Sequence, residues 1–162
     1  NFNPDGTIQK VIPTLRGVGL TKARSHIQID RYSALQGKGI GIDYLDKNNC
    51  FAGWKTLFSK SNTALIYNKV DFGNEKVEEI TVRAKSVKGG VLVVRADGKK
   101  GNIIAKVKIP KSAAWKNVRA QVLHAPQGVH ALHVSLQSGA DVEVDWLGFI
   151  KLSNLKNKKN SL

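Results

Sequence analysis

The chain has 162 residues, 41% of them hydrophobic, which suits one domain with a proper core and excludes wholesale disorder. It carries 26 Lys and Arg against 12 Asp and Glu, and its single cysteine, Cys50, excludes an intramolecular disulfide framework. No apolar run approaches the roughly 18 residues that a membrane span needs.

The chain begins at Asn1 and contains no Met, so we expect a piece of a longer protein. In chain order, residues 1–24 are interpreted as a linker and residues 25–152 as the compact domain. Residues 153–162, rich in Asn and Lys, are interpreted as a basic flexible tail.

Apolar and polar residues alternate with a period of two, and helical periodicity is nearly missing. The alternation and short apolar runs predict strands, in chain order, at 79–85, 91–95, 105–109, 118–123, 131–136 and 142–146. Glycine-containing turn signals separate them, at 88–90, 97–101, 126–128 and 138–139. Short strands at this spacing predict an all-β fold, an antiparallel β-sandwich or jelly roll.

The last predicted strand carries three acids on one face and three apolar residues on the other: Asp141, Glu143 and Asp145 against Val142, Val144 and Trp146. The acids fit a solvated strand face, a calcium site completed by distant oxygens, or the acid pair of a glycosidase. A catalytic pair needs a cleft deep enough to raise one pKa, which a small sandwich rarely supplies. The alternation places Trp146 in the core. No histidine pair has a spacing that would share a metal on a strand.

Five segments then carry a more specific pattern: 27–34, 66–73, 109–115, 127–132 and 143–149. In this order they resemble the motifs of family 6 carbohydrate-binding modules, over about residues 27–150. The leading segment 3–14 also resembles the connector that follows the catalytic domain in family 43 glycoside hydrolases. That resemblance implies a missing upstream enzyme of the arabinofuranosidase or xylosidase type.

The resemblance implies a galactose-binding-like jelly roll with a sugar site among the loops at one end. There, two aromatic rings clamp the C–H faces of a sugar while polar groups bind its hydroxyls. Carried over residue by residue, the clamp rings fall at Phe58 and Trp115, and the family's Asn is Glu143. The family's loop Glu has no counterpart near Gly41. Three of four positions depart from the pattern, which implies either altered specificity or lost sugar binding.

The stretch between Gly41 and Trp54 adds Tyr44 and Phe51 among short polar residues. Aromatic rings interleaved with polar side chains suit a sugar-stacking surface, so Tyr44 and Trp54 join the candidate binding residues. The alternative is that these rings close the end of the sandwich as part of its core.

The family also often holds a structural calcium, and the matching positions are Gln28, Asp30 and Asp145. Gln28 supplies a neutral oxygen where the family commonly has Glu, so two carboxylates and backbone carbonyls would have to suffice. The alternative is that a neighbouring Lys or a water takes the place of the ion.

Together these features predict a non-catalytic carbohydrate-binding module of a secreted or periplasmic enzyme. It would target an attached glycoside hydrolase to a plant polysaccharide of xylan or arabinan type by aromatic stacking. One alternative is a structural accessory domain that packs on the catalytic domain and has lost sugar binding. Another is a nucleic-acid-binding domain, suggested by the net charge of +14. The basic residues are spread along the chain, and this predicts weak polyanion affinity rather than a groove.

Overall fold

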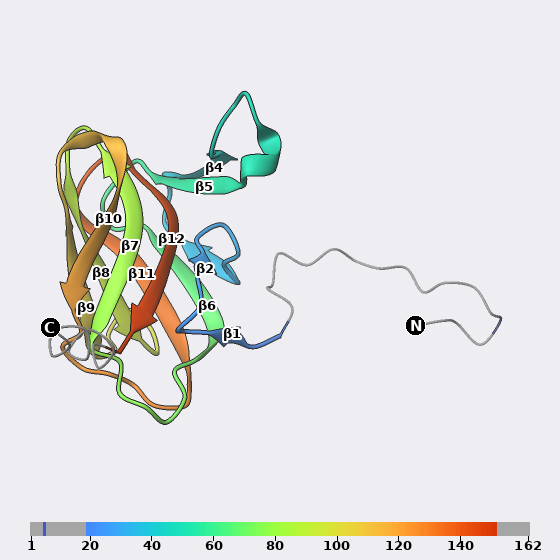
Figure 1. Cartoon of the computed structure of the whole chain (residues 1–162), viewed down its shortest axis with the longest axis vertical. Coiled ribbons are helices and arrows are strands. Elements are labelled where there is room, and N and C mark those ends of the chain that lie inside the picture. Colours follow the sequence, from blue (N-terminus) through green and yellow to red (C-terminus); the bar gives the residue numbers. More distant parts are fainter. Residues whose placement is uncertain (1–4, 6–18, 152–162) are drawn as a thin grey trace, which may run out of the picture.

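The computed structural model describes residue 5 and residues 19–151. Within this part the chain forms two β-sheets packed face to face, with one short 3₁₀ helix, Cys50–Ala52 (Figure 1). The predicted all-β sandwich of jelly-roll type is therefore confirmed. The predicted tail and most of the predicted linker lie outside the described residues. None of the described residues belongs to a helix long and apolar enough to cross a bilayer.

The first sheet has the strand order β1-β6-β11-β8-β9, and β3 pairs with β6 at its edge. Its pairs are antiparallel except for β1 with β6, which is parallel. The strands are β1 (Thr21–Lys22), β3 (Ala34–Gln36), β6 (Ala64–Asp71), β8 (Gly90–Ala96), β9 (Ile103–Ile109) and β11 (Val129–Gly139).

The second sheet has the strand order β10-β7-β12-β5-β4, and β2 pairs with β12. All its pairs are antiparallel. The strands are β2 (Ile27–Gln28), β4 (Ile40–Tyr44), β5 (Trp54–Phe58), β7 (Glu79–Ser86), β10 (Ser112–Gln121) and β12 (Val142–Ile150). The hairpin of β4 and β5 projects beyond the sandwich (Figure 1).

The core lies between the sheets and follows the period-2 pattern. On β7, every second residue from Ile80 to Ala84 is buried, and Arg83 and Lys85 point outward. Phe72 and Phe149 meet edge to face in the core, with ring centroids 5.1 Å apart. Burial of these apolar faces from both sheets is the main contribution to the stability of the sandwich.

Two aromatic residues lie elsewhere than the sequence predicts. Phe58 pairs with Val142 and is fully buried in the core. Trp146, predicted in the core, is half-buried and stacks on His26, with ring centroids 3.8 Å apart. A register shift between Val144 and Trp146 is the reason, because the extra residue of a β-bulge reverses the alternation that follows it.

The folded part also begins earlier than the predicted boundary at residue 25. Thr21 of β1 pairs with Val70 of β6, and the Arg24 guanidinium lies 2.6 Å from a carboxylate oxygen of Glu75. Residues 21–24 therefore belong to the sandwich rather than to a linker.

Candidate functional site

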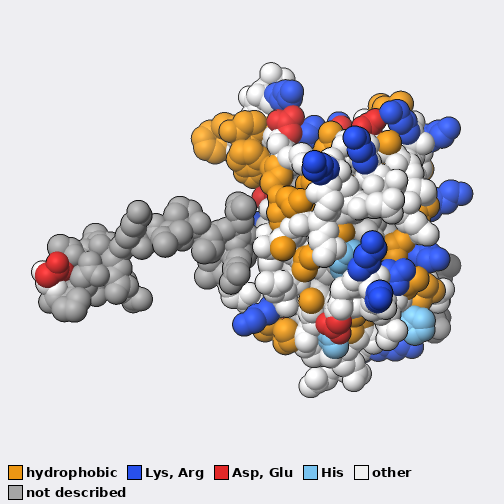
Figure 2. Space-filling model, turned by 180° about the vertical axis from the view of Figure 1, so that it is seen from behind, with side chains coloured by type: hydrophobic (Ala, Val, Ile, Leu, Met, Phe, Trp, Pro, Cys, Tyr) orange, Lys and Arg blue, Asp and Glu red, His pale blue; other side chains and the backbone are white. Residues whose placement is uncertain are grey.

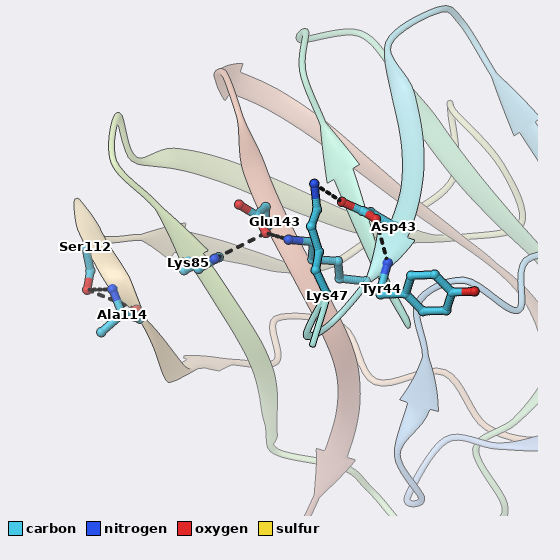
Figure 3. A network of polar contacts seen from close by, with 8 residues as sticks. Asp43, Tyr44, Lys47, Lys85, Ser112, Ala114 and Glu143 are labelled. Carbon is cyan, nitrogen blue, oxygen red and sulfur yellow. Dashed lines mark hydrogen bonds and ion pairs between the residues drawn. The ribbon is translucent and has the colours of Figure 1, made fainter. Parts of the chain in front are cut away.

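The outer face of the second sheet brings one charged cluster together around Glu143 of β12. Its Oε2 lies 2.6 Å from Nζ of Lys55 on β5 and 3.4 Å from Nζ of Lys85 on β7 (Figure 3). The Lys55 contact lacks hydrogen-bond alignment and is an ion pair. Two ammonium groups thus hold one half-buried carboxylate in place, and such a group can accept hydrogen bonds from ligand hydroxyls.

Trp115 lies beside this cluster, on strand β10 rather than in the loop where the resemblance places it. The pairing of β10 with β7 shifts register between Ser112 and Lys116, so Trp115 belongs to an irregular part of the strand. The Arg83 guanidinium carbon and the Lys85 Nζ lie 5.2 Å and 5.1 Å from the centroid of its half-buried ring. These cation–π contacts orient the indole on the sheet face.

A hollow of about 410 Å³ lies at the end of the sandwich, and Lys85, whose ammonium contacts the Trp115 ring, is one of its lining residues. Lys85 and Glu143 line it together with Ser112, and the ion pair of Lys88 with Asp141, 2.6 Å long, also borders it. Its size and its few converging polar groups are those of a small-molecule site. The outer face of the second sheet thus offers one aromatic surface with donors and acceptors next to it.

The predicted aromatic clamp is wrong at Phe58. Its ring is fully buried against the opposite sheet and cannot meet a ligand. The neighbouring side chain on the outer face is Leu57, which pairs with Glu143. The structure therefore supplies Trp115 as a single stacking ring, without a second ring from β5.

Tyr44 and Trp54 form a separate aromatic pair on the projecting hairpin. Their rings stack with centroids 4.4 Å apart and planes 28° from parallel. They lie on the face opposite to the neighbouring cross-strand pair Asp43 and Lys55, and Figure 3 shows the Tyr44 ring directed away from Glu143. The structure does not bring these two rings together with Trp115.

The hairpin also exposes other hydrophobic side chains, and Phe51 is 95% exposed. Figure 2 shows them as a projecting hydrophobic patch at the end of the molecule. We call this patch the apolar arm, and it consists of Ile42, Tyr44, Phe51 and Trp54.

The predicted calcium ligands have other neighbours in the structure. Asp145 is 5% exposed and forms an ion pair with Arg83, which compensates its charge. Burial raises the pKa of the Tyr67 hydroxyl well above its usual value, and the nearby charge of Asp30 raises it further. Among the described residues, no three His, Cys, Asp or Glu side chains gather around a common point. Calcium at Gln28, Asp30 and Asp145 stays a prediction.

Lys55, Lys85 and Arg83, which surround Glu143 and Trp115, are not among the binding residues that the sequence predicts. Their signal is present in the alternation of 79–85, where Arg83 and Lys85 take the outward positions. Which acid and which ring they meet depends on the pairing of β7 with β10 and β12.

Comparison with known proteins assigns the family. The model of the carbohydrate-binding module family 6 matches residues 36–151, and the chain belongs to this family of non-catalytic binding modules. The comparison with curated protein sequences gave no match.

Solved structures agree with the fold. The chain is similar to CsCBM6-3 from Clostridium stercorarium in complex with cellobiose, with 21% identity and a TM-score of 0.73 over 83% of this chain and 99% of that one. It is similar to a β-1,3-glucan-binding family 6 module from Bacillus halodurans, with 21% identity and a TM-score of 0.71 over 82% of this chain and 100% of that one. A family 43 arabinoxylan arabinofuranohydrolase from Bacillus subtilis matches with 18% identity and a TM-score of 0.74, over 93% of this chain and 32% of that one.

Proposed function

We propose that this module targets an attached glycoside hydrolase to a plant polysaccharide of xylan or arabinan type through the outer face of its second sheet. The observation that carries the proposal is the half-buried Trp115 ring in contact with Lys85, which together with Glu143 lines a hollow on this face. The similarity to the arabinofuranohydrolase and the resemblance of segment 3–14 support the attached enzyme. Plant polymers do not enter cells, so we expect this enzyme to be secreted or periplasmic.

The chemistry of the face suits a single pyranose or furanose unit. The sugar ring stacks its C–H face on Trp115, Glu143 accepts hydrogen bonds from hydroxyls, and the ammonium of Lys85 donates to them. Sugar hydroxyls already bind water well, so the net gain per unit is modest. Tethering nevertheless raises the local concentration of the enzyme at its polymer.

Affinity electrophoresis of the chain in gels that contain xylan, arabinan or other plant glycans tests this proposal. We expect the unchanged chain to be retarded, and Trp115→Ala to lower its affinity at least about tenfold because the stacking surface is lost. Trp54→Ala is the matched control, since Trp54 lies on the apolar arm away from Glu143, and it should leave the retardation unchanged. Equal loss in both variants, or retention by Trp115→Ala, would contradict the proposed face.

The apolar arm favours a second candidate function, a structural domain that packs on the catalytic domain. A projecting hydrophobic patch of this kind marks a contact surface, and Phe51 is almost fully exposed. An unchanged chain that no plant glycan retards would favour this candidate. If the module has this structural role, we expect Phe51→Ser to weaken its association with the catalytic domain and Trp115→Ala to leave that association unchanged.

A further inference from the structure

Three segments of the chain meet around the half-buried imidazole ring of His130, near the start of β11. The turn after β8 supplies the carboxylate of Asp97, and the loop between β10 and β11 supplies the main-chain carbonyl of Gln127. Phe72, directly after β6, meets the ring edge to face, with ring centroids 6.5 Å apart. Asp97 is thus the charged group that faces the imidazole, and the other two neighbours are uncharged.

Both ring nitrogens of His130 face hydrogen-bond acceptors. Nδ1 lies 2.8 Å from Oδ2 of Asp97, and Nε2 lies 2.8 Å from the Gln127 carbonyl oxygen. A carbonyl and an ionised carboxylate can only accept, so each contact needs an N–H on the ring. The neutral imidazole carries one N–H, and the imidazolium carries two. The geometry therefore fits the protonated ring, and loss of the proton leaves two lone pairs facing each other across one of the contacts.

The carboxylate of Asp97 is fixed by the main chain of β11. The Asp97 N–H donates to the Ala131 carbonyl, 2.9 Å away, and Oδ1 accepts from the Ala131 N–H, 3.1 Å away. The hydrogen bond to His130 lowers the pKa of Asp97, so this carboxylate is ionised near neutral pH. The same hydrogen bond raises the pKa of His130; burial of the ring opposes this increase, and the Gln127 carbonyl adds to it.

The other contact of the ring holds the loop between β10 and β11, which in turn contacts the segment after β6. The Gly128 N–H donates to the Gly73 carbonyl, and the Phe72 N–H donates to the Gly128 carbonyl, each over 2.8 Å. Through Gln127, the ring of His130 therefore joins this pair of loops to the turn after β8.

We propose that His130 is a pH-sensitive switch, whose imidazolium form holds the loop between β10 and β11 against the turn after β8. Above neutral pH the ring keeps its N–H toward the Asp97 carboxylate and releases the Gln127 carbonyl, because the contact with the charged partner is the stronger one. The proposal goes beyond the function proposed above, since none of these residues belongs to the face around Trp115.

The direction of the pH effect follows from the folded and unfolded states. Because the pKa of His130 is raised in the folded state, its contribution to stability is fully present below the ordinary value of 6.5. That contribution is lost as the pH rises through the pKa of the folded state. We therefore expect the loop to be held at mildly acidic pH and loosened at mildly alkaline pH.

Proton NMR titration of the histidine rings in the full chain tests the protonation step. We expect the midpoint of His130 to lie above 6.5. Asp97→Asn should shift this midpoint downward, because an amide oxygen accepts from Nδ1 but no longer stabilises the positive charge. Asn also tolerates the φ of 56° at this position, so the turn should keep its shape. A midpoint of 6.5 or below in the unchanged chain would overturn the proposal.

Amide hydrogen exchange tests the release of the loop, with protection factors corrected for the intrinsic effect of pH on exchange. Between about pH 6 and about pH 8.5, which span the titration of a histidine with a raised pKa, we expect the protection of the Gly128 N–H to fall at least about threefold. An equal fall for the amides of the central strand β7 would show destabilisation of the whole domain, and would overturn the release of one loop.

His130→Asn should abolish the pH dependence of Gly128 protection, because no titrating ring remains at this position. His124→Asn is the matched control. His124 is an exposed histidine whose Nδ1 lies 3.1 Å from the Ile103 carbonyl oxygen, a contact that needs only one N–H. This variant should keep the fall of the unchanged chain. The same fall in His130→Asn would assign the effect to another group and overturn the proposal.

Discussion

Asp145 shows how a single residue links the interior to the candidate binding face. Its carboxylate is buried and contacts the Arg83 guanidinium, and the same guanidinium lies over the Trp115 ring. Arg83 therefore compensates a buried charge and also orients the proposed stacking surface.

Arg83→Gln should lower the free energy of unfolding by about 1–3 kcal/mol, because it leaves the Asp145 carboxylate buried without its cation. Urea denaturation followed by Trp fluorescence measures this change. Lys47→Gln is the control, since Lys47 and its partner Asp43 are both exposed and lie 3.6 Å apart, so its loss should change stability by less than about 0.5 kcal/mol. Equal effects of the two substitutions would contradict the importance of the Asp145 pair.

Residue types alone also misplaced two rings. Phe58, predicted to clamp a ligand, lies in the core. Trp146, predicted to lie in the core, is half-buried and stacks on His26. Aromatic side chains serve both environments, so their chemistry does not decide between them.

At the scale of elements, tight turns hold the strand ends around the hollow that Lys85 and Glu143 line. Gly139 ends β11 with a φ of 91°, in the left-handed region that favours glycine. A Cβ atom built there would lie 2.3 Å from the Gly89 carbonyl oxygen. The turn between β7 and β8 and the end of β11 therefore approach as closely as backbones without a side chain allow.

Gly139→Ala should destabilise the domain by at least about 1–3 kcal/mol, because it combines backbone strain with a clash against a neighbouring main chain. Gly98→Ala is the control: its φ is 108°, but nothing lies within 4 Å of its Cβ position, so it carries only the strain. Urea midpoints of both variants measure the difference. A Gly139→Ala variant no less stable than Gly98→Ala would contradict the close approach.

At the scale of the whole molecule, the sandwich presents two outer faces with different chemistry. The face of the second sheet carries Trp115 beside a compensated carboxylate, and the face of the first sheet carries Arg95 and Lys99 without one. The two sheets of one jelly roll therefore present separable surfaces.

Calcium binding is a prediction at the same scale, because its proposed ligands join the N-terminal segment to β12. Gln28 of β2 pairs with Trp146, next to Asp145. If calcium binds the folded state, a concentration 100 times its Kd should stabilise that state by about 2.7 kcal/mol, and EDTA should reverse the gain. Thermal unfolding with and without calcium measures this, with Asp30→Asn as the variant that loses the effect. An unfolding temperature insensitive to millimolar calcium in the unchanged chain would show that the prediction is wrong.

The alternation in 79–85, 105–109 and 142–146 determined the all-β class and most strands of the sandwich, because a strand with one buried face must place every second side chain inside. The ordered motifs likewise indicated the family that the comparisons assign. What only the tertiary structure decided was the direction of particular side chains. A bulge at Asp145 turned Trp146 outward, and pairing with Val142 buried Phe58.

The switch at His130 was equally beyond reach of the sequence, which predicted no partner for that histidine. Asp97 lies 33 positions earlier in the chain, and only the pairing of β11 with β8 brings its carboxylate to the ring. Local periodicity is encoded in neighbouring residues, whereas a site assembled across strands depends on contacts between segments far apart in the chain.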